Sequence, residues 1–233
     1  MADLASARER MVNVQIAGRG IRDHKVLDAM RRVPREAFLD PDMEEFAYED
    51  GPLPIGEGQT ISQPYIVALM IEAAELGADD RVLEVGAGSG YAAAVMSRIA
   101  GTVYAIERHA ALGVAAQRRI EQLGYDNIAL RIDDGTRGWP ELAPFDVILV
   151  AASGPDVPHK LKEQLAIGGR LLIPVGRQRF GQRLCKITRR TDTDYDEEDL
   201  GRVAFVPLIG EQGWAEDGRR AASDRVPPPR RLG

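Results

Sequence analysis

The sequence is poor in the side chains that bind metals or form disulfides. It has one cysteine, Cys185, and three histidines, His24, His109 and His159, among 233 residues. A single cysteine excludes an internal disulfide framework and any cysteine-rich zinc or iron–sulfur site. Histidines scattered this widely argue against a histidine-based metal site. We therefore expect no bound metal and a reducing compartment, the cytoplasm.

The chain also lacks a basic excess, a high aromatic content and long apolar runs. Thirty Lys and Arg stand against 36 Asp and Glu, a net charge of −6, and aromatics make up 6 %. Nucleic-acid binders usually carry a basic excess, often with aromatics that stack on bases. No apolar run approaches the ~20 residues of a membrane-spanning helix, and the first residues do not resemble a signal peptide. These absences predict a chain that binds neither nucleic acid nor membranes.

What the sequence does contain is typical of a globular protein. Hydrophobic residues account for 44 % and charged residues for 28 %. At ~150 residues per domain, the length allows one large domain or two small ones. A glycine- and proline-rich stretch, residues 51–64, follows a helical N-terminal part. We expect a monomer with a single domain: N-terminal helices and a loop over 1–63, a core over 64–208, and a partly disordered tail over 209–233.

From about residue 80, short apolar strands alternate with helices. The expected strands are residues 81–85, 102–106, 127–132, 145–150 and 169–175, and the expected helices are 92–99, 110–123 and 157–165. Parallel neighbours need crossover helices, so this alternation predicts an α/β fold with a doubly wound, mostly parallel sheet. Two more apolar runs, 183–188 and 202–208, predict an antiparallel pair that completes seven strands. The acidic run 192–199 between them is expected to be an exposed hairpin tip.

The strongest local signal is a strand that leads into three glycines, Gly86, Gly88 and Gly90, and then into a helix. Glycines at the carboxyl end of a strand let the backbone turn sharply and let a ligand approach closely. A dinucleotide-binding loop would have its third glycine where this chain has Tyr91. Glu84 precedes the loop, and its carboxylate suits a cationic ligand better than a pyrophosphate. The loop therefore favours S-adenosylmethionine over NAD.

Two further acidic residues follow the next strands. Glu107 ends the second strand, where a carboxylate can accept hydrogen bonds from both ribose hydroxyls. Asp134 follows the third strand, where an acid can accept one from the adenine amino group. Because the carboxyl ends of parallel strands meet at one edge of a sheet, we expect these acids and the glycine loop to form one cofactor site.

A more specific motif precedes this core, and other motifs follow in a fixed order. The specific one is Leu53-Pro-Ile-Gly-Glu-Gly-Gln-Thr-Ile-Ser-Gln-Pro-Tyr65. The supporting blocks are Val33-Pro-Arg-Glu-Ala-Phe38, Ala143-Pro-Phe-Asp146, Gly168-Gly-Arg-Leu-Leu-Ile-Pro-Val-Gly176 and Phe205-Val-Pro-Leu208. Over residues 8–208 the chain thus resembles the protein-L-isoaspartate O-methyltransferases, which belong to the Rossmann-like, S-adenosylmethionine-dependent methyltransferases.

The resemblance implies a reaction and roles for individual residues. The reaction is methyl transfer from S-adenosylmethionine to the free α-carboxylate of L-isoaspartyl residues in damaged proteins and peptides, which starts repair through a succinimide; D-aspartyl substrates are left open. Ser62 matches the family's active-site serine, and Gln59 and Thr60 belong to the loop that covers the isoaspartyl group. The cofactor pocket is matched by Glu84, Gly86, Ala87, Gly88, Gly90, Glu107, Arg108, Asp134 and Gly135.

The implied chemistry needs no strong base. The α-carboxylate is already ionised at neutral pH, since its pKa is ~3.5–4. Ser62 would then position the carboxylate by donating a hydrogen bond, without acting as a covalent nucleophile. The sequence leaves open a second role for Ser62, as an ordinary N-cap of the helix that Pro64 begins.

Two positions depart from the family pattern. Asp133 is expected to add a second charge near the adenine, and Ser153 is expected to change a substrate-side contact. Two alternatives also stay open, since fold alone does not decide function. The first is a methyltransferase of the same fold that acts on a nucleic acid, a small molecule or another peptide carboxylate. The second is a non-catalytic binding module that keeps the fold.

Overall fold

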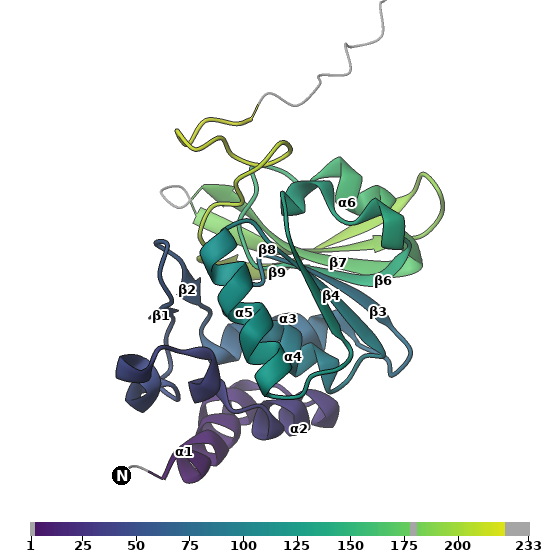
Figure 1. Ribbon diagram of the computed structural model, residues 1–233. Coiled ribbons are helices and arrows are strands. Elements are labelled where there is room, and N and C mark those ends of the chain that lie inside the picture. Colours follow the sequence, from purple (N-terminus) through teal and green to yellow (C-terminus); the bar gives the residue numbers. More distant parts are fainter. Residues whose placement is uncertain (1–2, 178–180, 222–233) are drawn as a thin grey trace, which may run out of the picture.

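The computed structural model describes residues 3–177 and 181–221, and its centre is a seven-stranded sheet with the order β5-β4-β3-β6-β7-β8-β9 (Figure 1). The strands are β3 (Arg81–Val85), β4 (Thr102–Glu107), β5 (Ile128–Ile132), β6 (Phe145–Val150), β7 (Leu165–Arg177), β8 (Gly181–Arg189) and β9 (Tyr195–Val203). Neighbouring strands are parallel from β5 through β4, β3 and β6 to β7. The pairs β7–β8 and β8–β9 are antiparallel. The predicted sheet, mostly parallel with an antiparallel pair at one end, is confirmed.

Helices cover both faces of this sheet, because successive side chains of a strand point to opposite faces. Val82, Val103 and Val147 belong to one hydrophobic cluster, and Leu83 and Ile148 belong to the other. The first face is covered by α3 (Pro64–Ala74), α4 (Tyr91–Ser97) and α5 (Ala110–Gln122), and the second by α6 (His159–Glu163). Burial on both faces explains why the parallel strands read as continuous apolar runs. In the described part of the chain, no helix is both long and apolar enough to cross a membrane.

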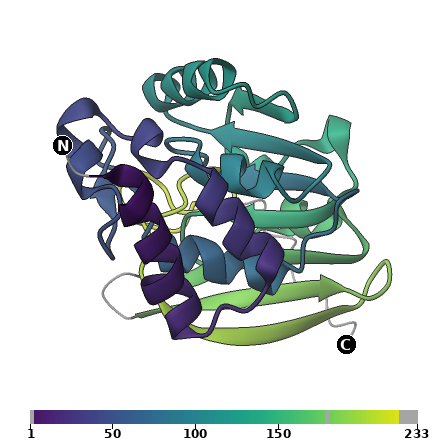
Figure 2. The same ribbon diagram turned by 90° about the horizontal axis from the view of Figure 1, so that it is seen from below.

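The N-terminal part forms a helical layer over α3 and α4, at the lower end of the molecule in Figure 1 and facing the viewer in Figure 2. It contains α1 (Leu4–Arg10), a π-helical turn (Met11–Ile16), α2 (His24–Arg32), and 3-10 turns at Ala17–Arg19, Arg35–Phe38 and Pro41–Phe46. Asp23 is the N-cap of α2, and its carboxylate accepts a hydrogen bond from Lys25 N at 2.8 Å.

One buried charge joins this layer to the core. The Arg35 side chain is fully buried, and its Nε donates a hydrogen bond to Ala47 O at 2.8 Å. Its guanidinium carbon lies 5.0 Å from the centre of the Tyr91 ring, within cation–π range. Tyr91 is the first residue of α4 and follows the glycine loop directly. The N-terminal layer therefore packs directly behind the predicted cofactor site.

The stretch 51–64 contains a short antiparallel pair, β1 (Leu53–Pro54) and β2 (Thr60–Ile61), where the sequence indicated no regular structure. The turn between these strands has three consecutive residues with positive φ: 88° at Gly56, 51° at Glu57 and 66° at Gly58. Glycine adopts this region without strain, so the two glycines allow the turn. The hairpin ends directly before Ser62 and the start of α3.

The predicted position of the last strand is wrong. β9 covers Tyr195–Val203 and not residues 202–208, so much of the acidic run 192–199 belongs to a strand. Charged side chains are tolerated because β9 is the edge of the sheet. Arg183 on β8 also pairs with Glu197 at 3.0 Å. Residues 204–208 leave the sheet. Of residues 209–221, expected to begin a tail, 209–215 fold back onto the protein with Gly213 and Trp214 buried, and 216–220 are exposed. Residues 222–233, the rest of that expected tail, lie outside the described part.

Candidate functional site

A cavity that is open to solvent lies at the carboxyl ends of β3, β4 and β6. Its lining comes from the β1–β2 hairpin, the loop after β3, the end of β4, and the segment after β9. In the sheet, β4 and β6 lie on either side of β3. The chain therefore reverses its winding direction beside β3 and opens a crevice there. This is the position at which open α/β sheets bind their ligands.

The glycine loop follows the end of β4 closely. Gly86 N and Ala87 N both donate to Ile106 O, at 2.8 and 3.1 Å. The φ angles of Gly86, Gly88 and Gly90 are 87°, 54° and 88°, values that favour glycine. Gly86, Ala87 and Gly88 line the cavity. Gly90 does not; it turns the chain into α4, of which it is the N-cap.

Two buried acids lie under the glycine loop. Glu84 on β3 is 1 % exposed, and its Oε2 has no hydrogen-bond partner among the described residues. Burial, and then the nearby Glu107, raise the pKa of Glu84 well above the usual carboxyl range. Glu107 is 4 % exposed and accepts hydrogen bonds from Gly88 N and His109 N, both at 2.8 Å. Glu107 is thus held by the backbone, whereas Glu84 keeps an unused acceptor in a cavity wall.

The three residues predicted to bind substrate, Gln59, Thr60 and Ser62, all line the same cavity. Their hairpin packs on the glycine loop, because Ile55 Cδ1 lies 3.1 Å from the place a Cβ on Gly88 would take. Ser62 is half-buried, and the N-cap of α3 is Gln63, with no side-chain hydrogen bond to the helix. Ser62 is therefore not the N-cap that the sequence left open.

Of the remaining residues predicted to bind the cofactor, some line the cavity and one does not. Arg108 and Gly135 line the cavity, and Asp134 does not. The Asp134 carboxylate accepts hydrogen bonds from Thr136 N at 2.9 Å, Thr136 Oγ1 at 2.7 Å and Glu211 N at 2.8 Å. This side chain therefore holds other parts of the protein, and its role toward an adenine amino group stays a prediction.

Neither of the two departures from the family pattern lines the cavity. Ser153 is fully buried, and its Oγ donates to Gly176 O at 2.9 Å. The hydroxyl is thus used by the β7 backbone, and an effect of Ser153 on a substrate-side contact stays a prediction. Asp133 is exposed and pairs with Arg131 at 3.1 Å. It adds a surface ion pair and no charge to the cavity lining.

Two parts of the cavity lining were not among the predicted site residues. His109 lines the cavity, and its Nδ1 lies 3.8 Å from Glu57 Oε2 on the hairpin. The segment from Val206 to Ile209 also lines it, although the sequence placed most of that segment in a strand. The Phe-Val-Pro-Leu block was a signal for this segment, but nothing local in it indicated a path across the strand ends.

The single cysteine is remote from this chemistry. Cys185 lies in β8 and is fully buried, and burial raises the pKa of its thiol to about 11. It is a residue of the hydrophobic core. Among residues 3–177 and 181–221, no group of three or more His, Cys, Asp or Glu side chains is arranged to hold a metal ion.

Gly135 tests how tightly the base of the cavity is packed. A Cβ at Gly135 would lie 2.5 Å from Val85 Cγ1. Overpacking of this kind costs ~1–3 kcal/mol, and we expect Gly135→Ala to lower the free energy of unfolding in urea by that amount. Gly51→Ala is the matched control, because nothing lies within 4 Å of its Cβ position. Equal losses of stability in the two variants would contradict this packing.

Comparison with known proteins identifies the family. The family model described as "Protein-L-isoaspartate(D-aspartate) O-methyltransferase (PCMT)" matches residues 6–213. The chain is 59 % identical over 214 residues to a protein-L-isoaspartate O-methyltransferase of Methylorubrum extorquens (strain PA1), covering 92 % of this chain and 93 % of that protein. It is 57 % identical over 221 residues to protein-L-isoaspartate O-methyltransferase 1 of Rhodopseudomonas palustris (strain HaA2), covering 95 % and 90 %.

Solved structures agree. One protein-L-isoaspartate O-methyltransferase superimposes with a TM-score of 0.80 at 32 % identity, covering 88 % of this chain and 67 % of that one. Another, from Plasmodium falciparum in complex with S-adenosyl-L-homocysteine, gives a TM-score of 0.76 at 28 % identity, covering 87 % and 98 %. The resemblance inferred from the motifs is confirmed over most of the chain. This chain therefore belongs to the protein-L-isoaspartate(D-aspartate) O-methyltransferase family.

Proposed function

We propose that this chain transfers a methyl group from S-adenosylmethionine to the free α-carboxylate of L-isoaspartyl residues in proteins and peptides. Relatives with more than half of their aligned residues identical are named for this activity. A solved relative holds S-adenosyl-L-homocysteine, the product that this cofactor leaves after methyl transfer. In this chain, the observation that supports the proposal most directly is the unpartnered, buried carboxyl of Glu84 in the wall of the cavity.

The residues present fit this cofactor. Its methionine part carries an ammonium group, which can donate hydrogen bonds to the free Oε2 of Glu84. Glu107, fixed at the end of β4, would hold the ribose hydroxyls. The glycine loop has no side chain at Gly86 and Gly88, so the backbone can come close to the ligand. Arg108 and Gly135 would border the adenine.

The same cavity can position the acceptor. The hairpin residues Gln59 and Thr60 and the half-buried Ser62 line it with amide and hydroxyl groups. A hydroxyl that donates to a carboxylate oxygen binds the carboxylate without removing its charge. Ser62 is therefore proposed as the residue that orients the α-carboxylate.

The chemical step needs no further catalytic group from the protein. When bound, S-adenosylmethionine supplies a methyl group activated by a positively charged sulfur. A carboxylate oxygen forms the new bond as the carbon–sulfur bond breaks, and the bonding electron pair stays on sulfur. Both charges disappear, so no proton has to move and no general base is needed. Holding the two groups in line is the main contribution, worth ~7–11 kcal/mol in the best intramolecular cases.

An acceptor comparison separates this function from its alternative. An isoaspartyl peptide, a matching D-aspartyl peptide, succinate and N-acetylaspartate would each be incubated with the protein and labelled S-adenosylmethionine. We expect methylation of the isoaspartyl peptide and background levels with both small carboxylates. Preferred methylation of a small carboxylate would instead support a same-fold enzyme with a small-molecule substrate. The D-aspartyl peptide tests whether the protein also methylates D-aspartyl residues, which the family description includes.

The oligomeric state, the compartment and the absence of nucleic-acid binding are proposed as well. We propose a monomer of 25.5 kDa that works in the cytoplasm and does not bind nucleic acid, in keeping with its net charge of −6. Light scattering of the purified chain checks the first part. A measured mass of twice this value would overturn it.

A further inference from the structure

The segment after β9 forms one wall of the cavity and then doubles back on itself. Val206 to Ile209 line the cavity. Beyond them, Trp214 N donates to Leu208 O at 2.7 Å, and Gly210 N donates to Trp214 O at 3.1 Å. Residues 208–216, called the strap below, are therefore a closed turn whose first residues face the cavity.

The first anchor of the strap is the carbonyl group of Ser153, just after β6. This oxygen accepts hydrogen bonds from Leu208 N at 2.9 Å and from the indole Nε1 of Trp214 at 2.8 Å. Trp214 is 6 % exposed, and the Arg177 guanidinium carbon lies 5.0 Å from its ring centre. A buried indole that shares an acceptor with the cavity-lining Leu208 fixes the position of that residue.

The second anchor lies across the sheet, after β5. Asp134 accepts a hydrogen bond from Glu211 N at 2.8 Å, and Thr136 Oγ1 accepts one from Gln212 N at 3.1 Å. Gly210 packs so closely that a Cβ on it would collide with the Asp134 carboxylate. In the sheet, β4 and β3 lie between β5 and β6. The strap thus connects the two strand ends that flank the ends carrying Glu107 and the glycine loop.

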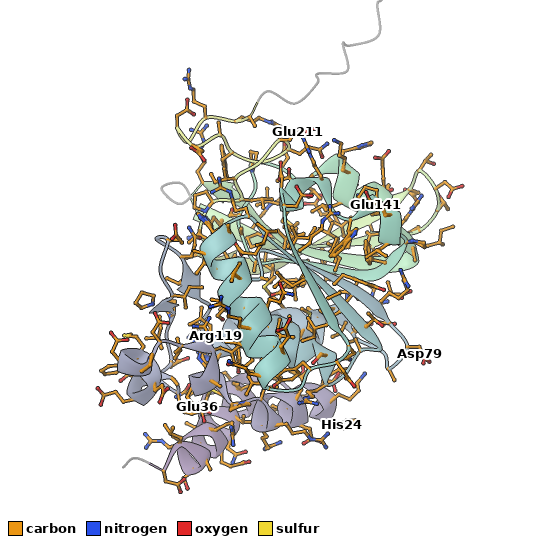
Figure 3. The ribbon with its side chains drawn as sticks, viewed as in Figure 1. His24, Glu36, Asp79, Arg119, Glu141 and Glu211 are labelled. Atoms are coloured by element: carbon orange, nitrogen blue, oxygen red, sulfur yellow. The ribbon has the colours of Figure 1, made fainter. Side chains whose placement is uncertain are left out.

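Ion pairs complete the attachment on the outside. Glu211 contacts Lys160 and Arg137, both at 2.7 Å, at the end of the molecule opposite the labelled His24 and Glu36 (Figure 3). Glu216 pairs at 3.0 Å with Arg108, which lines the cavity. The Glu216 side chain is 83 % exposed, and exposed pairs contribute little. The buried Trp214 and the hydrogen bonds to Asp134 and Thr136 are therefore the anchors that matter for the attachment.

We propose that the strap is a fixed wall of the cofactor site and that Trp214 is its positioning residue. Trp214 acts through Leu208 and Ile209, which it holds against the bound cofactor, and it touches neither the sulfonium nor the acceptor carboxylate. The inference rests on the proposed function only in taking S-adenosylmethionine as the ligand. The family match ends at residue 213, so Trp214 and Glu216 lie beyond it.

The chain offers a spectroscopic test because it has only two tryptophans, Trp139 and Trp214. In Trp139→Phe, Trp214 is the sole indole reporter, and because a fixed wall does not move, we expect its emission to stay that of a buried indole when S-adenosyl-L-homocysteine is added. In Trp214→Phe, the remaining Trp139, which packs on Tyr104, should not respond either. A red shift of the Trp214 emission at saturating ligand, as expected of an indole that leaves its buried position, would overturn the proposal.

Affinity gives the second readout. Trp214→Phe keeps an aromatic ring and loses the indole N–H, so we expect the dissociation constant of S-adenosyl-L-homocysteine, measured by calorimetry, to rise about fivefold. Gly210→Ala, which displaces the Asp134 carboxylate, should weaken binding in the same direction and serves if the first variant does not fold. At saturating cofactor, the kcat of each variant and its KM for peptide should stay near the wild-type values.

Trp139→Phe is the matched control and should keep the wild-type affinity. A structural role alone would lower the melting temperature of Trp214→Phe without changing its affinity for the ligand, and this outcome contradicts the proposal. Binding of S-adenosyl-L-homocysteine is measured without any acceptor. A wild-type chain that binds this ligand but methylates no isoaspartyl peptide would overturn the proposed function while leaving the strap proposal in place.

Discussion

Glu84→Gln is expected to weaken the binding of S-adenosyl-L-homocysteine, which carries the same ammonium group as S-adenosylmethionine. The Glu84 carboxyl is buried with an unpartnered Oε2, and glutamine keeps its size but cannot take a negative charge. A hydrogen bond to a charged group contributes ~1.5–3 kcal/mol, so the dissociation constant should rise roughly 10- to 100-fold. Calorimetric titration measures the change without any methyl transfer.

The same carboxyl predicts a pH dependence. Burial and Glu107 raise the pKa of Glu84, so in the free protein it keeps its proton where an ordinary glutamate has lost it. An ammonium ligand favours the ionised form, and binding must therefore release that proton. Affinity should fall as the pH is lowered, because more protons then compete with the ligand. Titrations in buffers of different ionisation enthalpy should show more proton release by the wild type than by Glu84→Gln.

A second glutamate controls for the charge change. Glu163 on α6 is exposed and contacts His159 at 3.3 Å, away from the cavity. Glu163→Gln should bind the ligand as the wild type does and release the same proton. If Glu84→Gln kept full affinity, or still released a proton on binding, Glu84 would not be the acceptor for the ammonium group.

We expect Ser62→Ala to lower the turnover of an isoaspartyl peptide and to leave cofactor binding nearly unchanged. Ser62 lines the cavity from the hairpin and does not cap α3, so its hydroxyl is available to an acceptor. Loss of one hydrogen bond to a carboxylate should lower kcat/KM for an isoaspartyl peptide roughly 10- to 100-fold. Affinity for S-adenosyl-L-homocysteine should be nearly unchanged, because none of the proposed cofactor contacts comes from Ser62 or its hairpin.

Ser62→Thr is the conservative control. Threonine keeps a hydroxyl at the same place, and we expect it to restore part of the lost activity, whereas alanine should not. The measurement is a pair of initial-rate series, one against peptide and one against cofactor. A collapse of cofactor affinity in Ser62→Ala would show that the serine supports the fold of the hairpin and does not position the acceptor.

The parallel half of the fold was readable from the sequence because its signals are local. Strands β3, β4 and β6 bury apolar side chains on both faces, and the strands alternate with helices that begin or end at glycine, proline or acidic residues. The glycine loop was predicted for the same reason. Positive φ at Gly86, Gly88 and Gly90 is a property of single residues, and it appears in the sequence as glycine.

The parts that were missed depend on contacts between distant segments. β9 was expected at residues 202–208 because that run is apolar, yet Val206 and Leu208 line the cavity and the acidic residues occupy the edge of the sheet. The strap is held by the carbonyl group of Ser153 and by the carboxylate of Asp134. A backbone acceptor leaves no trace in the residue type, so sequence alone could not predict this attachment.

Asp134 shows the limit of reading function from position. It stands where a cofactor-binding acid was expected, directly after β5. Its oxygens accept hydrogen bonds from Thr136 and from Glu211 N. The position of Asp134 in the fold was predicted correctly. Its hydrogen-bond partners were not, because one of them lies on a segment about eighty residues later in the chain.

The most direct test of the account compares two peptides that differ only in one linkage. An isoaspartyl peptide and its normal aspartyl twin would be incubated with the wild-type chain and methyl-labelled S-adenosylmethionine, and the esterified carboxyl located by mass spectrometry. The account predicts label on the isoaspartyl peptide alone, as a base-labile ester of its free α-carboxylate. Equal labelling of both peptides, or labelling of neither, would contradict it.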